Sequence, residues 1–198
     1  MNGMPVTLER AIEEVGRYRH GLKIMGGGFT LTGGEPLMQD RFAVRLFSAL
    51  KKRGIHTALN TNGCFGERLS DEELEQIDLV ILDIKTWDRE AHRRLTGKDV
   101  GPTLNFARRL AERKRPLWTR FVVVPGLTDN EADISQIAAF TAGLGNVERV
   151  DVLPFHQMGR YKWKKLEIYY ALEHVEPPGH ELIERTCEQF RAAGLNVF

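Results

Sequence analysis

Residues 26–36 have the sequence GGGFTLTGGEP, in which a short apolar run stands between two groups of glycines. Residues 29–32 are β-branched, aromatic or aliphatic, which favours a strand. The two glycines that follow predict a tight turn, and Glu35 stands where the next helix would begin. Residues 26–36 therefore predict a strand that leads through a glycine turn into a helix.

The same alternation continues along the chain. Helical patterns are expected over residues 7–20, 38–53, 70–77, 88–95, 102–114, 130–143 and 179–193. Short apolar runs, expected as strands, occupy residues 29–32, 55–59, 79–84, 117–124, 147–153 and 195–198. Alternating strands and helices predict right-handed βαβ units and a mainly parallel sheet covered by helices. We therefore predict a single α/β domain over residues 1–198.

Composition limits the classes of function. The chain has 28 basic and 27 acidic residues and a net charge of +1, which argues against a nucleic acid or a membrane surface as its main partner. We expect no signal peptide, because the first 20 residues contain Glu9, Glu13 and Glu14 and no apolar run. We expect no membrane span, because no stretch approaches the roughly 18 consecutive apolar residues that a span needs. Two isolated cysteines favour a reducing, cytoplasmic setting over a disulfide framework.

Polar side chains stand at the carboxyl ends of the predicted strands. They are Glu35, then Asn60, Thr61 and Asn62, then Asp83 and Lys85, and finally His156. Parallel βα units bring these strand ends to one face, which is where such folds bind ligands. This convergence is the strongest sign of a binding site in the sequence.

Several of these residues allow a structural interpretation as well as a functional one. Gly33 and Gly34 would let backbone amides approach a ligand, and Glu35 could accept hydrogen bonds from an ammonium group; the alternative is a tight turn with a solvated glutamate. Asp83 and Lys85 share one face of a strand. They could bind a cation or ribose hydroxyl and a ligand carboxylate, or form a salt bridge at the strand end.

Arg120, His156 and the two cysteines also allow more than one interpretation. Arg120 lies inside an apolar run, so it either pairs with a structural carboxylate or faces a polar barrel lumen, and we favour the lumen. His156 could be a structural histidine, but its strand-end position favours a functional one. Cys64, in a turn, and Cys187, on the apolar stripe of a helix, are expected to be packing residues.

Residues 156–179 interrupt the strand–helix alternation. They are rich in Gly, Tyr, Trp, Lys and Pro, and residues 160–165 have the sequence RYKWKK. A long loop inside a domain is usually functional or disordered. Interleaved basic and aromatic residues could bind single-stranded nucleic acid, but in a nearly neutral protein they favour a protein-docking surface.

Several motifs together resemble one enzyme family. Residues 26–39 are similar to its Gly-Gly-Glu motif region, and residues 120–126, RFVVVPG, to its Arg-Tyr-Val-Val-Val-Pro-Gly strand. Residues 153–163, LPFHQMGRYKW, and residues 175–178, VEPP, are similar to two more specific signatures. From Val6 to Phe198 the chain resembles the glycyl-radical-enzyme activating enzymes of the S-adenosylmethionine (SAM) radical superfamily.

This resemblance implies a fold and a reaction. The fold would be a partial (β/α)6 radical SAM barrel with its first βα unit missing. The reaction would be that of a radical SAM oxidoreductase of anaerobic metabolism, in which a 5′-deoxyadenosyl radical takes a hydrogen atom from a backbone glycine of the partner. The partner would be a glycyl radical enzyme of the pyruvate formate-lyase type, and flavodoxin or ferredoxin would donate the electron. The alternative is a catalytically inactive SAM-binding or docking fragment of such an enzyme.

The resemblance also implies roles for residues. Gly33, Gly34 and Glu35 would hold the amino group of SAM. The segment Asp83, Ile84 and Lys85 would contact the amino-acid end of SAM and its surroundings, Arg120 would orient ligand or substrate, and His156 would contact the ribose or the substrate backbone. A monovalent cation would be bound by Asn60, Thr61 and Asp83.

The chain departs from the family pattern in two ways. The family's Cys-x-x-x-Cys-x-x-Cys motif, which holds a [4Fe–4S] cluster, does not occur in these residues, whose only cysteines are Cys64 and Cys187. Asn60 stands where aspartate is more frequent, which would weaken the cation site by one negative charge.

Overall fold

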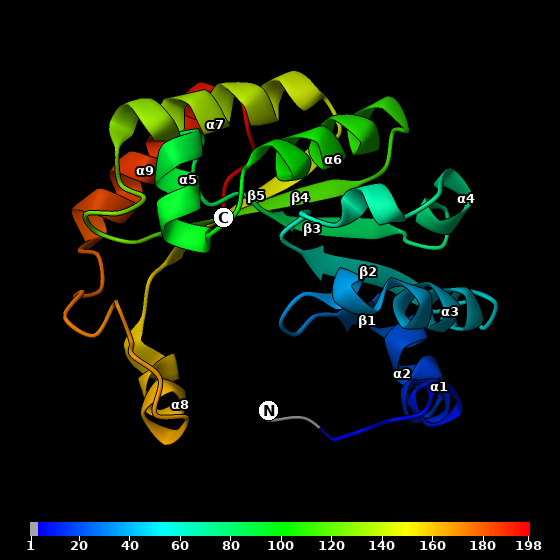
Figure 1. Ribbon diagram of the computed structural model, residues 1–198. Helices are drawn as coiled ribbons and strands as arrows, with labels where there is room; N and C mark the ends of the chain where they lie inside the picture. The colour runs from blue at the N-terminus through cyan, green and yellow to red at the C-terminus, as the bar shows by residue number, and fades with distance from the viewer. Residues whose placement is uncertain (1–3) are drawn as a thin grey trace. The chain divides into compact units, whose positions relative to one another are not determined.

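The computed structural model describes residues 4–198, in which strands and helices alternate (Figure 1). The chain forms two compact units. The first contains the residues up to Asp83 together with Pro102–Leu117, and the second contains Ile84–Gly101 and Trp118–Phe198. The prediction of one domain over residues 1–198 stays a prediction.

The first unit contains three neighbouring strands in chain order, and two further strands lie in the second unit apart from Leu117. They are β1 (Gly28–Leu31), β2 (His56–Thr61), β3 (Leu79–Asp83), β4 (Leu117–Val123) and β5 (Val147–Pro154). β2 lies parallel to β1, with Gly28 opposite His56, and β3 lies parallel to β2, with Ala58 opposite Leu79. The α/β class with parallel strands, expected from the alternation, is thereby confirmed.

The first unit places helices against β1, β2 and β3. Its elements besides the strands are α1 (Leu8–Gly16), α2 (Arg19–Ile24), the 3₁₀ helix η1 (Pro36–Gln39), α3 (Asp40–Lys51), the 3₁₀ helix η2 (Gly66–Arg68), α4 (Asp71–Leu74) and nearly all of α6 (Gly101–Glu112). An apolar cluster around Leu46, Leu50 and Ile55 joins α3 to side chains of α1, α2 and β1. Burial of such side chains is the main stabilising contribution to this unit.

The second unit is built around β4 and β5. Its helices are α5 (Arg89–Thr96), α7 (Glu131–Leu144), the 3₁₀ helix η3 (Gln157–Gly159), α8 (Arg160–Lys165) and α9 (His180–Ala192). The ring of Phe121 in β4 lies 5.7 Å from that of Phe190 in α9, centroid to centroid. The C-terminal residues return to the sheet, where Val150 N–H donates to Asn196 O over 2.8 Å. No helix formed by residues 4–198 is long and apolar enough to cross a membrane.

Three elements differ from the sequence-based expectation. The helix expected over residues 7–20 is divided into α1 and α2, because Gly16 is a poor helix former and Tyr18 N–H bonds to Val15 O at 3₁₀ spacing. Residues 195–198 form an isolated bridge at Val197 instead of a strand. The loop expected over residues 156–179 contains η3 and α8.

Asp78 supplies a polar tie between α3 and the start of β2. Its carboxylate accepts from Lys51 Nζ over 2.6 Å and from Thr57 N–H over 2.9 Å. Burial opposes ionisation of Asp78, but the hydrogen bonds from Lys51 and Thr57 outweigh it and hold the pKa of the carboxyl below its usual range. The ionised form therefore stabilises the fold.

Asp78→Asn is expected to lower the free energy of unfolding at neutral pH by about 1–2 kcal/mol. Because the pKa is lower in the folded state, this contribution is present above the usual carboxyl pKa of about 4 and is lost as the pH falls through the folded value. Urea unfolding of both proteins across this pH range measures the difference. Glu75→Gln, at an exposed carboxylate nearby, is the control. An Asp78→Asn difference that does not shrink at low pH would contradict the assignment.

Candidate functional site

Glu35 is fixed by three hydrogen bonds at the end of the glycine turn that follows β1. Its Oε1 accepts from Leu37 N–H over 3.0 Å and from the Thr61 hydroxyl over 2.7 Å. Its Oε2 accepts from Asn62 N–H over 2.8 Å. The carboxylate thus caps η1 and ties the turn after β1 to the end of β2.

The turn after β2 is fixed by further hydrogen bonds, in addition to those that it makes with Glu35. Gly63 N–H donates to Thr61 Oγ1 over 3.0 Å, and Asn62 Oδ1 accepts from Cys64 N–H over 2.9 Å. The hydroxyl of Thr103 in α6 donates to Asn62 O over 2.7 Å. Gly63 has φ +74°, a left-handed conformation that favours glycine. The groups that hold Glu35 are therefore positioned before any ligand binds.

The backbone of the two glycines before Glu35 is accessible to a ligand. Gly33 and Gly34 are exposed, and a Cβ built on either would meet nothing within 4 Å. Gly33 has φ +148°, at the edge of the region that favours glycine. A carboxylate offers about four lone-pair positions, so Glu35 can accept from one further donor. This arrangement fits a ligand with an ammonium group.

The residues predicted to hold a monovalent cation lie at the ends of two paired strands, β2 and β3, whose register places Thr61 opposite Leu82. Asn60 Nδ2 donates to Thr32 Oγ1 over 3.1 Å, and the buried Thr61 hydroxyl is engaged by Glu35. Asp83 ends β3 in the same unit. Among residues 4–198, no group of three or more His, Cys, Asp or Glu side chains could hold a metal ion. The cation site stays a prediction.

The other predicted site residues belong to the second unit. Ile84 N–H donates to Arg120 O over 3.1 Å, so these two positions meet through their backbones. Lys85 is half-buried. His156 is exposed, and its Nδ1 accepts from Met158 N–H over 3.4 Å at the start of η3. The roles predicted for Ile84, Lys85, Arg120 and His156 stay predictions.

One anchoring group was not found from the sequence, and a second, Asn62, was found as a strand-end side chain but without its anchoring role. The carboxylate of Asp133, in the first turn of α7, accepts from the N–H groups of Trp87 and Asp88 over 2.6–3.0 Å. It thereby fixes the segment that follows Lys85. Asn62 fixes the turn after β2, because its N–H donates to Glu35 and its carbonyl accepts from the Thr103 hydroxyl. The Asn-Gly pair at residues 62 and 63 is a recognised turn signal and was the only available sign of this role.

The comparisons with known proteins agree with this architecture. The radical SAM superfamily profile matches residues 2–137. A pyruvate formate-lyase-activating enzyme from Staphylococcus epidermidis is 41% identical over 96% of this chain and 77% of its own length. The enzyme of the same name from Staphylococcus aureus strain USA300 is 43% identical over 90% of this chain and 74% of its own length. The chain belongs to the pyruvate formate-lyase-activating enzyme family of the radical SAM superfamily.

A solved structure supports the fold assignment. A domain of the pyruvate-formate lyase-activating enzyme from Bacteroides vulgatus matches with a TM-score of 0.70 and 23% identity, over 87% of this chain and 98% of that domain. At this identity the likeness establishes the fold alone. The partial radical SAM barrel and the family expected from residues 26–39, 120–126 and 153–163 are both confirmed.

The [4Fe–4S] cluster of this family needs three thiolates, and the donor set of this chain does not fit it. The sequence has two cysteines. Cys64 lies half-buried in the turn after β2, in the first unit. Cys187 is buried in α9, in the second unit, and burial raises the pKa of its thiol. Neither cysteine has the closely spaced second cysteine that the cluster motif requires, as the sequence spacing already indicated.

Proposed function

We propose that this protein takes part in SAM-dependent formation of a glycyl radical on an enzyme of the pyruvate formate-lyase type. The observation that carries the proposal is the 41% identity, over 96% of the chain, to an enzyme named for this activity. The glycine turn with its fixed glutamate supports it, because this turn offers an open backbone and a carboxylate to an amino-acid ligand. Cytoplasmic localisation, a role in anaerobic metabolism and electron donation by flavodoxin or ferredoxin are parts of the same proposal.

The residues of this chain would bind and orient the cofactor. Gly33 and Gly34 would lie against its amino-acid end, and Glu35 would accept from its amino group. The remaining predicted contacts come from Asp83, Ile84, Lys85, Arg120 and His156, and a monovalent cation would be held by Asn60, Thr61 and Asp83. On receiving one electron from a reduced iron–sulfur cluster, bound SAM would divide into methionine and the organic radical that removes a hydrogen atom from a backbone glycine of the partner.

Anaerobic treatment of the 198-residue chain with iron and sulfide is expected to give no stable [4Fe–4S] absorbance. The reason is that two cysteines cannot supply three thiolates. Ultraviolet–visible spectra and iron counts before and after desalting measure the outcome, with a Cys64→Ser and Cys187→Ser double variant as the control. A stoichiometric cluster in the unaltered chain that the double variant lacks would contradict this prediction.

The proposed function is tested by electron paramagnetic resonance. The chain is fused to a segment that carries Cys-x-x-x-Cys-x-x-Cys and is incubated anaerobically with SAM, a reductant and pyruvate formate-lyase. We expect a glycyl radical signal on pyruvate formate-lyase with this fusion and none with a fusion whose three motif cysteines are serines. A fusion that loads its cluster but produces no glycyl radical on pyruvate formate-lyase would overturn the proposed function.

A further inference from the structure

Residues 157–175 form a compact projection that the cofactor site does not use. Gln157 Nε2 donates to Leu172 O and to Val175 O, both over 2.8 Å, which closes the base of the segment. Ile168 N–H donates to Trp163 O over 3.1 Å and so turns the chain back after α8. We refer to these residues as the 157–175 segment. Its hydrogen bonds give a surface that is ordered before any partner binds.

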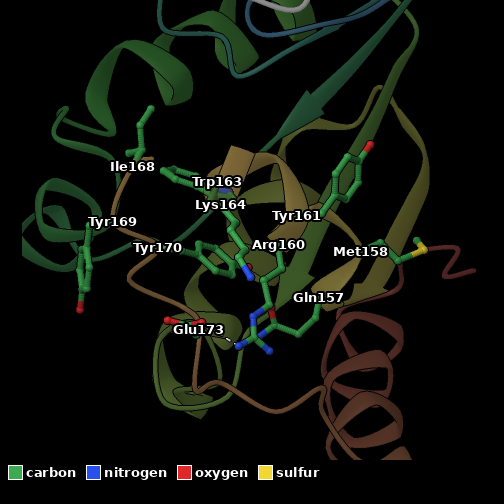
Figure 2. Close-up of a pocket in the computed structure, with 10 residues that line it drawn as sticks. All are labelled: Gln157, Met158, Arg160, Tyr161, Trp163, Lys164, Ile168, Tyr169, Tyr170 and Glu173. Atoms are coloured by element: carbon green, nitrogen blue, oxygen red, sulfur yellow. Dashed lines mark hydrogen bonds and ion pairs between the residues drawn. The ribbon is translucent and has the colours of Figure 1, made fainter. Parts of the chain in front are cut away.

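Side chains inside the 157–175 segment hold its centre together. Arg160 pairs with Glu173 over 2.6 Å, and this hydrogen bond holds the pKa of Glu173 below its usual range. The Trp163 ring stacks on that of Tyr170, with centroids 5.3 Å apart. Figure 2 shows these four side chains around the middle of the pocket, with Gln157 beside Arg160. The pocket therefore has a defined aromatic and polar lining.

Large apolar side chains of the same segment remain exposed. Tyr169 is 84% exposed, Met158 72%, Tyr161 64% and Ile168 53%. All four line the pocket, and in Figure 2 Tyr169 and Met158 extend away from its centre on opposite sides. Exposed Tyr, Trp and Met side chains gathered around a hollow are typical of surfaces that bind proteins.

The charge of the segment indicates the kind of partner. α8 contains four basic residues among six, Arg160, Lys162, Lys164 and Lys165. Arg160 is neutralised by Glu173, but the three lysines form no ion pair with any residue in the described range 4–198. Because the whole chain, with α8 included, has a net charge of only +1, this is a local excess of positive charge. Such a surface favours an acidic partner.

We propose that the 157–175 segment docks an acidic segment of the glycyl radical enzyme, and this inference rests on the proposed function. The partner would place an apolar side chain in the pocket between Tyr170 and Ile168, and its carboxylates would reach Lys162, Lys164 and Lys165. Salt bridges to the lysines would speed association, and the apolar contact would slow dissociation. A protein partner is favoured over a single-stranded nucleic acid because Trp163 already stacks on Tyr170 and is not free for a base on that side.

The test measures binding and does not depend on radical formation. Purified pyruvate formate-lyase of Staphylococcus epidermidis is immobilised, and the 198-residue chain is titrated over it by biolayer interferometry at low and at high salt. The first variant is Lys162→Glu, Lys164→Glu and Lys165→Glu together. Its matched control is Lys23→Glu, Lys52→Glu and Lys114→Glu, which makes the same change in net charge at exposed lysines of the first unit. Tyr169→Ala is compared with Tyr18→Ala, another tyrosine with a mostly exposed ring.

We expect the α8 triple variant to bind at least about tenfold more weakly and with less dependence on salt, and the control triple variant to change affinity by less than about threefold. Tyr169→Ala should dissociate faster than the wild type, whereas Tyr18→Ala should not. If the wild type and the α8 variant bind equally, docking by this segment is refuted and the proposed function stands. If the wild type does not bind pyruvate formate-lyase, both the docking proposal and the proposed function are refuted. Tighter binding of the wild type to an oligothymidylate than to pyruvate formate-lyase would overturn the docking proposal in favour of nucleic acid.

Discussion

Replacement of Glu35 by alanine is expected to remove SAM binding and to lower the free energy of unfolding by about 2–3 kcal/mol. The variant deletes the acceptor for Leu37 N–H, the Thr61 hydroxyl and Asn62 N–H at once. Thr61 is 2% exposed, so its hydroxyl cannot recover the lost bond from water. Calorimetric titration with SAM and urea unfolding measure the two effects.

Two further variants separate the contributions to the Glu35 effect. Thr61→Val removes one of the three donors but leaves the carboxylate, so it should cost about 1 kcal/mol of stability and retain part of the SAM affinity. Glu67→Ala removes an exposed glutamate of η2 and should change neither quantity. A Glu35→Ala protein that is as stable as the wild type would show that the three hydrogen bonds do not hold the turn. A normal SAM affinity in that protein would remove Glu35 from the cofactor site.

Gly66→Ala is expected to lower the free energy of unfolding by about 2–3 kcal/mol through a steric clash. A Cβ at Gly66 would lie 2.2 Å from Cγ and Cδ2 of Phe106, a ring of α6 that is 3% exposed. Because the φ angle of Gly66 is not positive, the effect is one of packing and not of backbone strain. Thermal and urea unfolding of the variant measure the loss.

A double-mutant cycle tests whether Phe106 is the cause of this clash. Phe106→Leu should be destabilising alone but less than additive with Gly66→Ala, because the smaller side chain leaves room for the new methyl group. Gly34→Ala is the matched control, since a Cβ there meets nothing within 4 Å. Strict additivity of the two substitutions would mean that Gly66 is required for another reason.

The strand ends could be predicted from the sequence because each follows a continuous apolar run. Residues 26–36 predicted β1, the glycine turn and the position of Glu35, and the structure confirms this local order. The two-cysteine count was enough to exclude three thiolate ligands, since that conclusion needs no three-dimensional information. Local pattern and composition therefore determined these features.

Other features depend on residues that are distant in the chain, and local pattern does not show them. The Thr103 hydroxyl bonds to Asn62 O across 41 positions, and Asp133 reaches Trp87 N–H across 46. Nothing in either segment alone indicates its partner. The division of the expected helix 7–20 was missed for a different reason, because the amphipathic pattern outweighed the effect of Gly16 in the sequence interpretation. The ligand roles of Asp83, Lys85, Arg120 and His156 depend on a bound cofactor and stay predictions.

The position of β1 at the end of the strand order has a consequence for aggregation. An edge strand can recruit strands from other molecules, and the number of hydrogen bonds that it offers sets how well it does so. β1 has four residues, two of them half-buried and two exposed. Its first residue, Gly28, lies so close to β2 that a Cβ would be 2.6 Å from His56 O. The glycine thus allows close pairing with β2, and an edge of only four residues is a poor template for the growth of fibrils from this chain.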